Sequence, residues 1–188
     1  MNFDTFKPPI AVISLTDICL LNCSFCNNSK KYSKNNIMEL EKFKIIIEKF
    51  IEQGIFSFEI TPTVGDSIII ENLYEYFDFL ENHPKVEKYF WFTSLVSKKQ
   101  LSKEKFEKIF NNRTKFYTVV SVYSLISTNF FKKTNSTLKK FNIFKSNLDL
   151  LLKHVNTTVI VRDRTDFSIL ESICFKKIVN ECKNSNII

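Results

Sequence analysis

The chain has 188 residues, of which 44% are hydrophobic and 25% are charged, a composition that argues against disorder and allows one domain with its own core. The formal net charge of +7 comes mostly from lysines mixed with acidic residues at helical spacing, so nucleic acid is not an expected partner. No apolar run approaches the ~20 residues that span a bilayer, and the N-terminus does not have the layout of a signal peptide, so we expect a cytoplasmic protein without a membrane partner.

The first half of the chain begins with a short apolar run at 10–15 that predicts a buried strand. A helix is expected over 36–53, with Asn36 as its N-cap and Gly54 just past its end. The next strand, 56–61, alternates between an apolar and a polar face. Its apolar face carries Phe56, Phe58 and Ile60, and its polar face carries Ser57, Glu59 and Thr61. A polar strand face suits the lumen of a barrel that holds a polar ligand.

The same alternation of helix and strand continues to the end. Further helices are expected around 70–80, 106–110 and 141–151 and over 168–182, and further strands at 86–93, 116–123 and 155–161. This order predicts an α/β fold of about five parallel β-α units in one domain, residues 1–188. Five units are too few for a closed eight-stranded barrel. An open sheet and an incomplete (β/α) barrel both remain possible.

Three cysteines, Cys19, Cys23 and Cys26, follow the first expected strand closely. The chain has five cysteines, and both the odd number and the crowding argue against a secreted disulfide scaffold. In parallel α/β folds, ligands bind at the carboxyl ends of the strands. The three thiolates can therefore cover one face of a metal centre, which leaves a further position without a local protein ligand.

Zinc is the first alternative for this motif, because structural zinc takes four Cys or His ligands. The two histidines, His83 and His154, fall at the C-terminal ends of expected helices, on the opposite side of the fold. Cys174 and Cys182 fall on the last expected helix, where packing is the simpler role. The spacing alone favours an iron–sulfur centre over zinc but leaves both open.

The pattern Cys19-x₃-Cys23-x₂-Cys26, with Phe25 before the last cysteine, resembles the signature of the radical S-adenosylmethionine (SAM) superfamily. The resemblance implies that these thiolates bind three irons of a 4Fe–4S cluster, whose fourth iron takes the amino and carboxylate groups of SAM. It also implies that the backbone near Phe25 contacts the adenine.

A second segment, from Thr61 through Val64 and Gly65 to Asp66, resembles the part of the same family that grips the amino group of SAM. The resemblance implies SAM contacts for Val64, Gly65 and Asp66. The residues alone leave open an ordinary turn in which Asp66 caps the next helix. The resemblance also places Ser121 and Arg162, at the ends of the fourth and fifth expected strands, beside SAM.

The resemblance implies a radical SAM enzyme that reductively cleaves SAM to a 5′-deoxyadenosyl radical, which abstracts hydrogen from an unknown substrate. A reductant protein of the flavodoxin or ferredoxin type is the expected partner. The family core has six strands, whereas this chain offers five and no C-terminal auxiliary-cluster extension. A truncated reading frame, a partner chain or oligomer at the open sheet edge and a minimal active form are the three explanations. The alternative function is a non-catalytic remnant or a metal-binding interaction module, with zinc or Fe–S.

Overall fold

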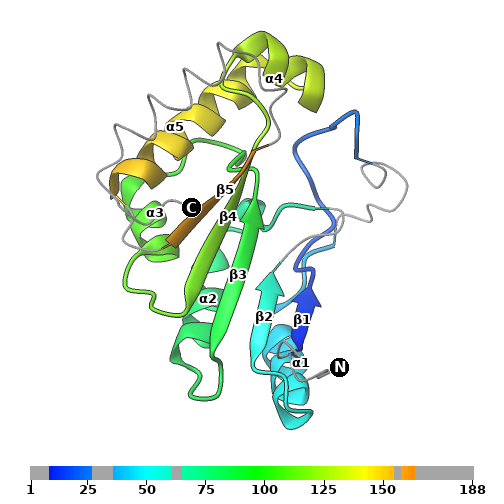
Figure 1. Ribbon diagram of the computed structural model, residues 1–188, viewed down its shortest axis with the longest axis vertical. Helices are drawn as coiled ribbons and strands as arrows, with labels where there is room; N and C mark the ends of the chain where they lie inside the picture. Colours follow the sequence, from blue (N-terminus) through cyan, green and yellow to red (C-terminus); the bar gives the residue numbers. More distant parts are fainter. Residues whose placement is uncertain (1–8, 27–35, 61–64, 155–157, 164–188) are drawn as a thin grey trace, which may run out of the picture.

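A computed structural model describes residues 9–26, 36–60, 65–154 and 158–163, and its centre is a five-stranded sheet (Figure 1). The strands are β1 (Ile10–Ile13), β2 (Ser57–Ile60), β3 (Lys88–Thr93), β4 (Phe116–Val122) and β5 (Thr158–Asp163). They lie in the order β1-β2-β3-β4-β5, and every neighbouring pair is parallel. This confirms the expected α/β class. Within the described residues the sheet does not close, as expected of an incomplete barrel.

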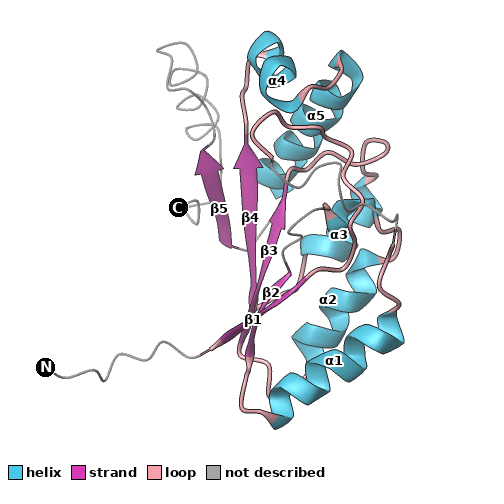
Figure 2. Cartoon of the chain, turned by 90° about the vertical axis from the view of Figure 1, so that its right-hand side faces the viewer, coloured by secondary structure: helices cyan, strands magenta, loops and turns pink. Residues whose placement is uncertain are grey.

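The helices lie together on one side of the sheet (Figure 2). They are α1 (Leu40–Glu52), α2 (Leu73–Asn82), α3 (Lys103–Phe110), α4 (Ser127–Thr134) and α5 (Leu138–His154), with a short 3₁₀ helix, η1, at Ser67–Ile69. A parallel strand can follow its neighbour only after a crossover, so the helical segment between two strands returns the chain to the amino end of the sheet; α4 and α5 share the last crossover. The described loops that follow β1, β3 and β4 consequently start at one edge of the sheet, the carboxyl edge.

Several boundaries differ from the sequence prediction. Asn36 is not the N-cap of α1, because its backbone is used elsewhere. Its N–H donates to Asp17 Oδ1 at 2.8 Å, and its carbonyl accepts from Thr16 Oγ1 at 2.7 Å. The helix begins at Leu40, after Glu39. α4 was not expected as a separate helix, β5 extends two residues beyond its expected end at 161, and the expected helix 168–182 lies outside the described residues.

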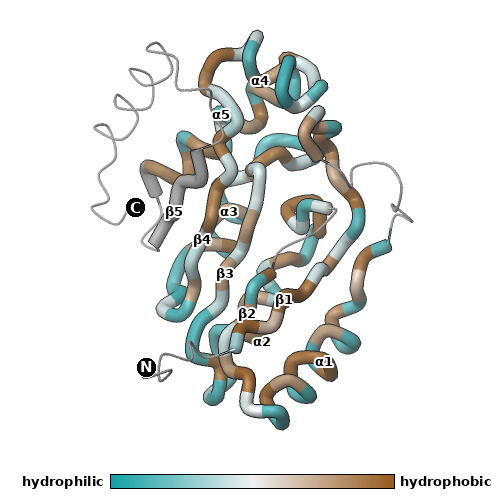
Figure 3. Tube along the Cα trace, turned by 45° about the vertical axis from the view of Figure 1, so that its right-hand side comes forward, coloured by the Kyte–Doolittle hydropathy of each residue, from teal (hydrophilic) through white to brown (hydrophobic). Residues whose placement is uncertain are grey.

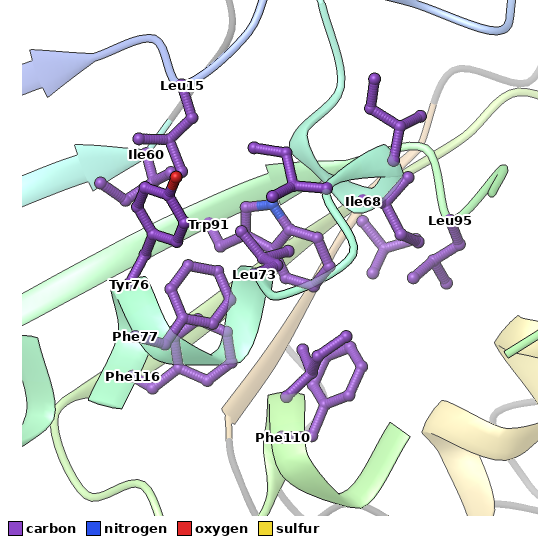
Figure 4. Close-up of a cluster of buried hydrophobic side chains, with 14 of the residues drawn as sticks. Leu15, Ile60, Ile68, Leu73, Tyr76, Phe77, Trp91, Leu95, Phe110 and Phe116 are labelled. Atoms are coloured by element: carbon purple, nitrogen blue, oxygen red, sulfur yellow. The ribbon is translucent and has the colours of Figure 1, made fainter. Parts of the chain in front are cut away.

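The core fills the space between the sheet and the helices (Figure 4). Trp91 of β3 is fully buried there, and its ring contacts those of Phe77, Phe110 and Phe116. The indole N–H of Trp91 donates to Ser67 Oγ at 2.8 Å, which satisfies the single polar atom of a large buried ring. This core holds the loops at the carboxyl edge of the sheet on a rigid base.

The other face of the sheet carries no described helix (Figure 2). Val12 is 56% exposed on this face and lies in register with Glu59, which is in turn in register with Phe90. The predicted alternation of β2 is confirmed for Phe58 and Ile60, which are buried on the helix side. Figure 3 shows the hydrophobic character of β1, whose alternate residues face this open side. Among the described helices, none combines the length and the apolar character needed to cross a bilayer.

Candidate functional site

The three motif cysteines lie in the loop that follows β1, at the carboxyl edge of the sheet. Cys23 is buried, with 9% of its surface exposed, and Cys19 and Cys26 are partly buried. All three are free of disulfides. The position matches the expectation that chemistry in a parallel α/β fold occurs at this edge.

The thiols lie near enough to influence one another electrostatically. Burial raises the pKa of Cys19 to about 11, and the charges of Asp66 and Cys26 add to this effect. Burial raises the pKa of Cys23 to about 12, again with contributions from Cys19 and Cys26. Both thiols are therefore protonated at neutral pH without a metal, and a bound metal would displace the protons. The three thiols therefore share one neighbourhood, and their role as cluster ligands stays a prediction.

The fit to a metal centre depends on which centre is considered. In the part of the chain that the structure describes, no group of three His, Cys, Asp or Glu side chains could hold a metal ion. A cluster in which each thiolate binds a different iron needs sulfurs further apart than those around one ion. His83, which the zinc alternative would need as a ligand, already has a partner, because its Nε2 lies 3.2 Å from Glu48 Oε1.

The sulfur of Cys19 accepts a backbone hydrogen bond. The N–H of Leu21 donates to Cys19 Sγ at 3.4 Å. The side chain of Tyr123 acts to lower the pKa of Cys23, against the larger effect of burial. Hydrogen bonds of this kind stabilise the negative charge of ligating thiolates, and in iron–sulfur proteins they help to set the reduction potential. The chemistry of the donor set therefore fits an iron–sulfur cluster.

The cysteine loop is fixed on the C-terminal end of α4 and the first turn of α5. The N–H of Asn22 donates to the carbonyl of Thr134 and that of Ser24 to the carbonyl of Lys133, both at 3.0 Å. The ammonium of Lys140 donates to the carbonyl of Leu20. The positive charge of Lys140 also lowers the pKa of Cys19, against the larger effect of burial. α4, which was not expected, is therefore part of what positions the cysteines.

The turn after β2 packs directly on the start of the cysteine loop. A Cβ at Gly65 would lie 2.3 Å from the carbonyl oxygen of Thr16 and 2.9 Å from the backbone nitrogen and oxygen of Ile18. The N–H of Asp66 donates to the carbonyl of Ile18 at 2.9 Å. This close approach explains the glycine without invoking a ligand. The predicted SAM contact of Gly65 stays a prediction, and Val64 lies outside the described residues.

The carboxylate of Asp66 is buried, with 4% exposure, and several donors surround it. It accepts from the N–H and hydroxyl of Ser94 at 2.7 and 2.6 Å, from Thr93 Oγ1 at 3.0 Å and from the N–H of Ile68 at 3.2 Å. Burial raises the pKa of Asp66, and these hydrogen bonds oppose the rise. Asp66 thus caps η1, the alternative that the sequence left open, and ties β2 to the end of β3. Its contact with SAM stays a prediction.

The remaining candidates lie at the ends of β4 and β5 or on the cysteine loop. Phe25 is 51% exposed, and its ring centroid lies 5.6 Å from that of Tyr123. Ser121 is partly buried, and its Cα is in register with that of Arg162, which places the two residues side by side on the sheet. Sequence reasoning did not select Tyr123, although its place two residues after Ser121 was a usable signal, since alternate strand residues share a face.

Comparison with known proteins relates this arrangement to solved structures. No family model matches the sequence, and no curated protein is significantly similar to it. SuiB of Streptococcus suis bound to the precursor peptide SuiA matches with a TM-score of 0.66 and 19% identity, over 94% of this chain and 37% of that one. SuiB bound to S-adenosylmethionine matches with a TM-score of 0.63 and 18% identity, over 96% and 38%. The methylornithine synthase PylB matches with a TM-score of 0.57 and 11% identity, over 81% and 43%.

These neighbours have the radical SAM TIM-barrel fold, and at such identities the likeness shows that this chain shares that fold. The chain spans less than half the length of each of these three structures.

Proposed function

We propose that this chain is the core of a radical SAM enzyme that holds a 4Fe–4S cluster on Cys19, Cys23 and Cys26 and binds SAM beside it. The observation that carries the proposal is the gathering of three buried or partly buried thiols in one loop at the carboxyl edge of the sheet. The likeness of 96% of the chain to the fold of a SAM-bound protein supports it.

When bound, the cluster supplies the electron that splits SAM into methionine and a 5′-deoxyadenosyl radical, for hydrogen abstraction from a substrate. The protein's own part is to bind and orient SAM and the substrate and to exclude water, since the cofactors carry out the difficult chemistry. The half-exposed ring of Phe25 is available beside the cysteines. Ser121 and Arg162, neighbours in the sheet register, provide polar groups at the ends of β4 and β5. Gly65 and Asp66 connect the turn after β2 to the cysteine loop.

The partners in this proposal are a reductant protein of the flavodoxin or ferredoxin type and a substrate that we do not identify, within the cytoplasm. The uncovered face of the sheet is where a substrate would lie in a barrel. On this face Ile10 is 44% and Val12 is 56% exposed. A partner chain or a second copy that completes the barrel is also part of the proposal.

The decisive experiment is anaerobic reconstitution of the purified chain with iron and sulfide, followed by an assay for 5′-deoxyadenosine with SAM and dithionite. We expect a 4Fe–4S stoichiometry and formation of 5′-deoxyadenosine. Cys23→Ala should abolish stable loading, because each thiolate is a direct ligand. Cys174→Ala and Cys182→Ala are the matched controls and should load normally. Stoichiometric zinc without iron would identify an interaction module instead, and a cluster without SAM cleavage would identify a non-catalytic remnant.

A further inference from the structure

A cavity with a volume of about 970 Å³ lies between the segments that follow β2 and β3. Its walls come from η1, the loop 97–102, the first turn of α3 and Leu150 of α5. None of the described residues that we propose for the cluster or for SAM lines it. Sites for small-molecule ligands commonly have volumes of roughly 300–1,000 Å³. The cavity is therefore a second candidate site, distinct from the cysteine loop.

Lysine side chains dominate the charge of this cavity. Four of them line it: Lys98, Lys99, Lys103 and Lys105. Glu71 is the one carboxylate among the described residues of its walls. Burial lowers the pKa of Lys105, and the charges of Lys99 and Lys98 act in the same direction, against that of Glu71. Within the described part of the chain, only Lys103 of the four forms an ion pair, with Glu107 at 3.8 Å. The cavity thus has positive charge that the described side chains do not neutralise.

The loop that carries two of these lysines is held in place by a buried side chain of α5. Asn147 is fully buried, and its amide N–H groups donate to the carbonyl of Leu95 at 2.9 Å and to Ser97 Oγ at 3.0 Å. Its side-chain oxygen accepts from the N–H of Leu101 at 3.1 Å. The hydroxyl of Ser97 also donates to the carbonyl of Lys99 at 2.6 Å. The loop is therefore fixed at both ends, and a ligand that binds there pays little for ordering it.

We propose that this cavity binds a small molecule that carries a phosphate or diphosphate group, and that Lys98, Lys99 and Lys105 hold this group. Ammonium groups donate charge-assisted hydrogen bonds to phosphate oxygens, and a bound anion relieves the repulsion among the three cations. Ile69 and Leu150 give the uncharged part of the ligand an apolar wall. A concave site of this volume suits a small molecule better than the broad surface of an acidic protein. The site needs neither the cluster nor SAM, so it goes beyond the proposed function.

The test is isothermal titration calorimetry of the purified full chain in a metal-free buffer, with pyrophosphate and phenyl phosphate as the probes. The double variant Lys99→Gln/Lys105→Gln removes two of the proposed contacts. Lys42→Gln/Lys49→Gln is the matched control, because it changes the net charge equally at two exposed positions of α1 that do not line the cavity. Circular dichroism checks that each variant is folded.

We expect each probe to bind at one site, and more weakly as the salt concentration rises, because salt screens the charges. Lys99→Gln/Lys105→Gln should bind pyrophosphate about 10-fold more weakly, and the control should bind it as the wild type does. A wild-type chain that binds neither probe, or an equal loss in the control, would refute the inference. Should the double variant fail to fold, an unchanged affinity in Lys98→Gln would refute it equally. Tighter binding of a hexaglutamate peptide than of either probe would identify an acidic protein partner instead and overturn it. The proposed cluster on the cysteines is unaffected by all of these outcomes.

Discussion

Gly65 is the tightest contact between the turn after β2 and the cysteine loop. A Cβ at this position would lie 2.3 Å from the carbonyl oxygen of Thr16. The cysteine loop must therefore move if the Gly65→Ala variant is to fold. We expect this variant to lose most of its iron after reconstitution and to be less stable by about 1–3 kcal/mol. Iron analysis and urea unfolding measure the two effects.

The matched control is Gly54→Ala. Gly54 has φ +81° and open space around it, so alanine there is strained by about 1–2 kcal/mol without a clash. It should lose stability but keep its iron. If the two variants lose iron to the same extent, the contact of Gly65 with the loop is not what positions the cysteines.

Glu81 of α2 predicts a specific pH dependence of stability. Burial acts to raise its pKa, but hydrogen bonds from Thr114, Tyr89 and Lys115 outweigh burial and lower it. A carboxylate with a lowered pKa in the folded state contributes stability above its unfolded value, about 4.3, and loses it as the pH falls through the folded pKa. Because solvent screens a carboxylate this exposed, Glu81→Gln should cost only about 0.5–1 kcal/mol at pH 7 and less below about pH 4.

Urea unfolding at several pH values tests this prediction. Glu104→Gln is the control, since Glu104 is exposed and pairs with Lys108 at 2.8 Å, and such pairs contribute little. A cost of Glu81→Gln that stays constant from pH 7 to pH 3 would show that the carboxylate charge is not responsible.

The sequence was informative about single residues wherever residue type and spacing define the chemistry. Cys19, Cys23 and Cys26 could be grouped because their separation keeps them in one loop. The environment of Asp66 could not be foreseen, because its donors Thr93 and Ser94 are distant in the sequence and become neighbours only through the sheet. The ring contact of Tyr123 with Phe25 depends on tertiary structure in the same way.

At the level of elements, the strands and the long helices followed from apolar periodicity, and α4 did not. α4 runs over Ser127–Thr134, has polar residues through most of its length and begins after Ile126 without a side-chain cap. Its stability comes from tertiary contacts, such as the fully buried ring of Phe130. Propensity alone rarely identifies a helix this short. The element nevertheless provides backbone acceptors for the cysteine loop.

The start of α5 offers a direct test of this docking. Lys140→Met removes the hydrogen bond to the carbonyl of Leu20 and the positive charge that acts on Cys19. We expect a cluster that loses iron to a chelator about 10-fold faster, in line with the usual effect of outer contacts on metal affinity. Lys139→Met, at the adjacent exposed position, is the control and should behave as the wild type. Equal rates for both variants would contradict a role for Lys140.

For the whole molecule, the helices cover one face of the sheet and leave the other open (Figure 2). Among the described strands, β1 and β5 each have one neighbour, so both edges present backbone donors and acceptors without a strand partner. The matched structures have the radical SAM barrel fold that this chain shares. The chain spans less than half the length of SuiB and of PylB. Sequence periodicity could establish the parallel units, but not what lies against the open face.

We expect the purified chain to associate along this open side in a concentration-dependent manner. Ile10 and Val12 are 44% and 56% exposed on a sheet edge, and apolar surface next to unpaired strand groups favours contact with another chain. Size-exclusion chromatography with light scattering should give a mass that rises with concentration. Val12→Lys should reduce the association, because a charge on an edge strand opposes pairing. Ile45→Lys, at a 57% exposed position on α1 rather than on a strand, should not. A mass that stays monomeric across the concentration range would show that the open side needs no partner.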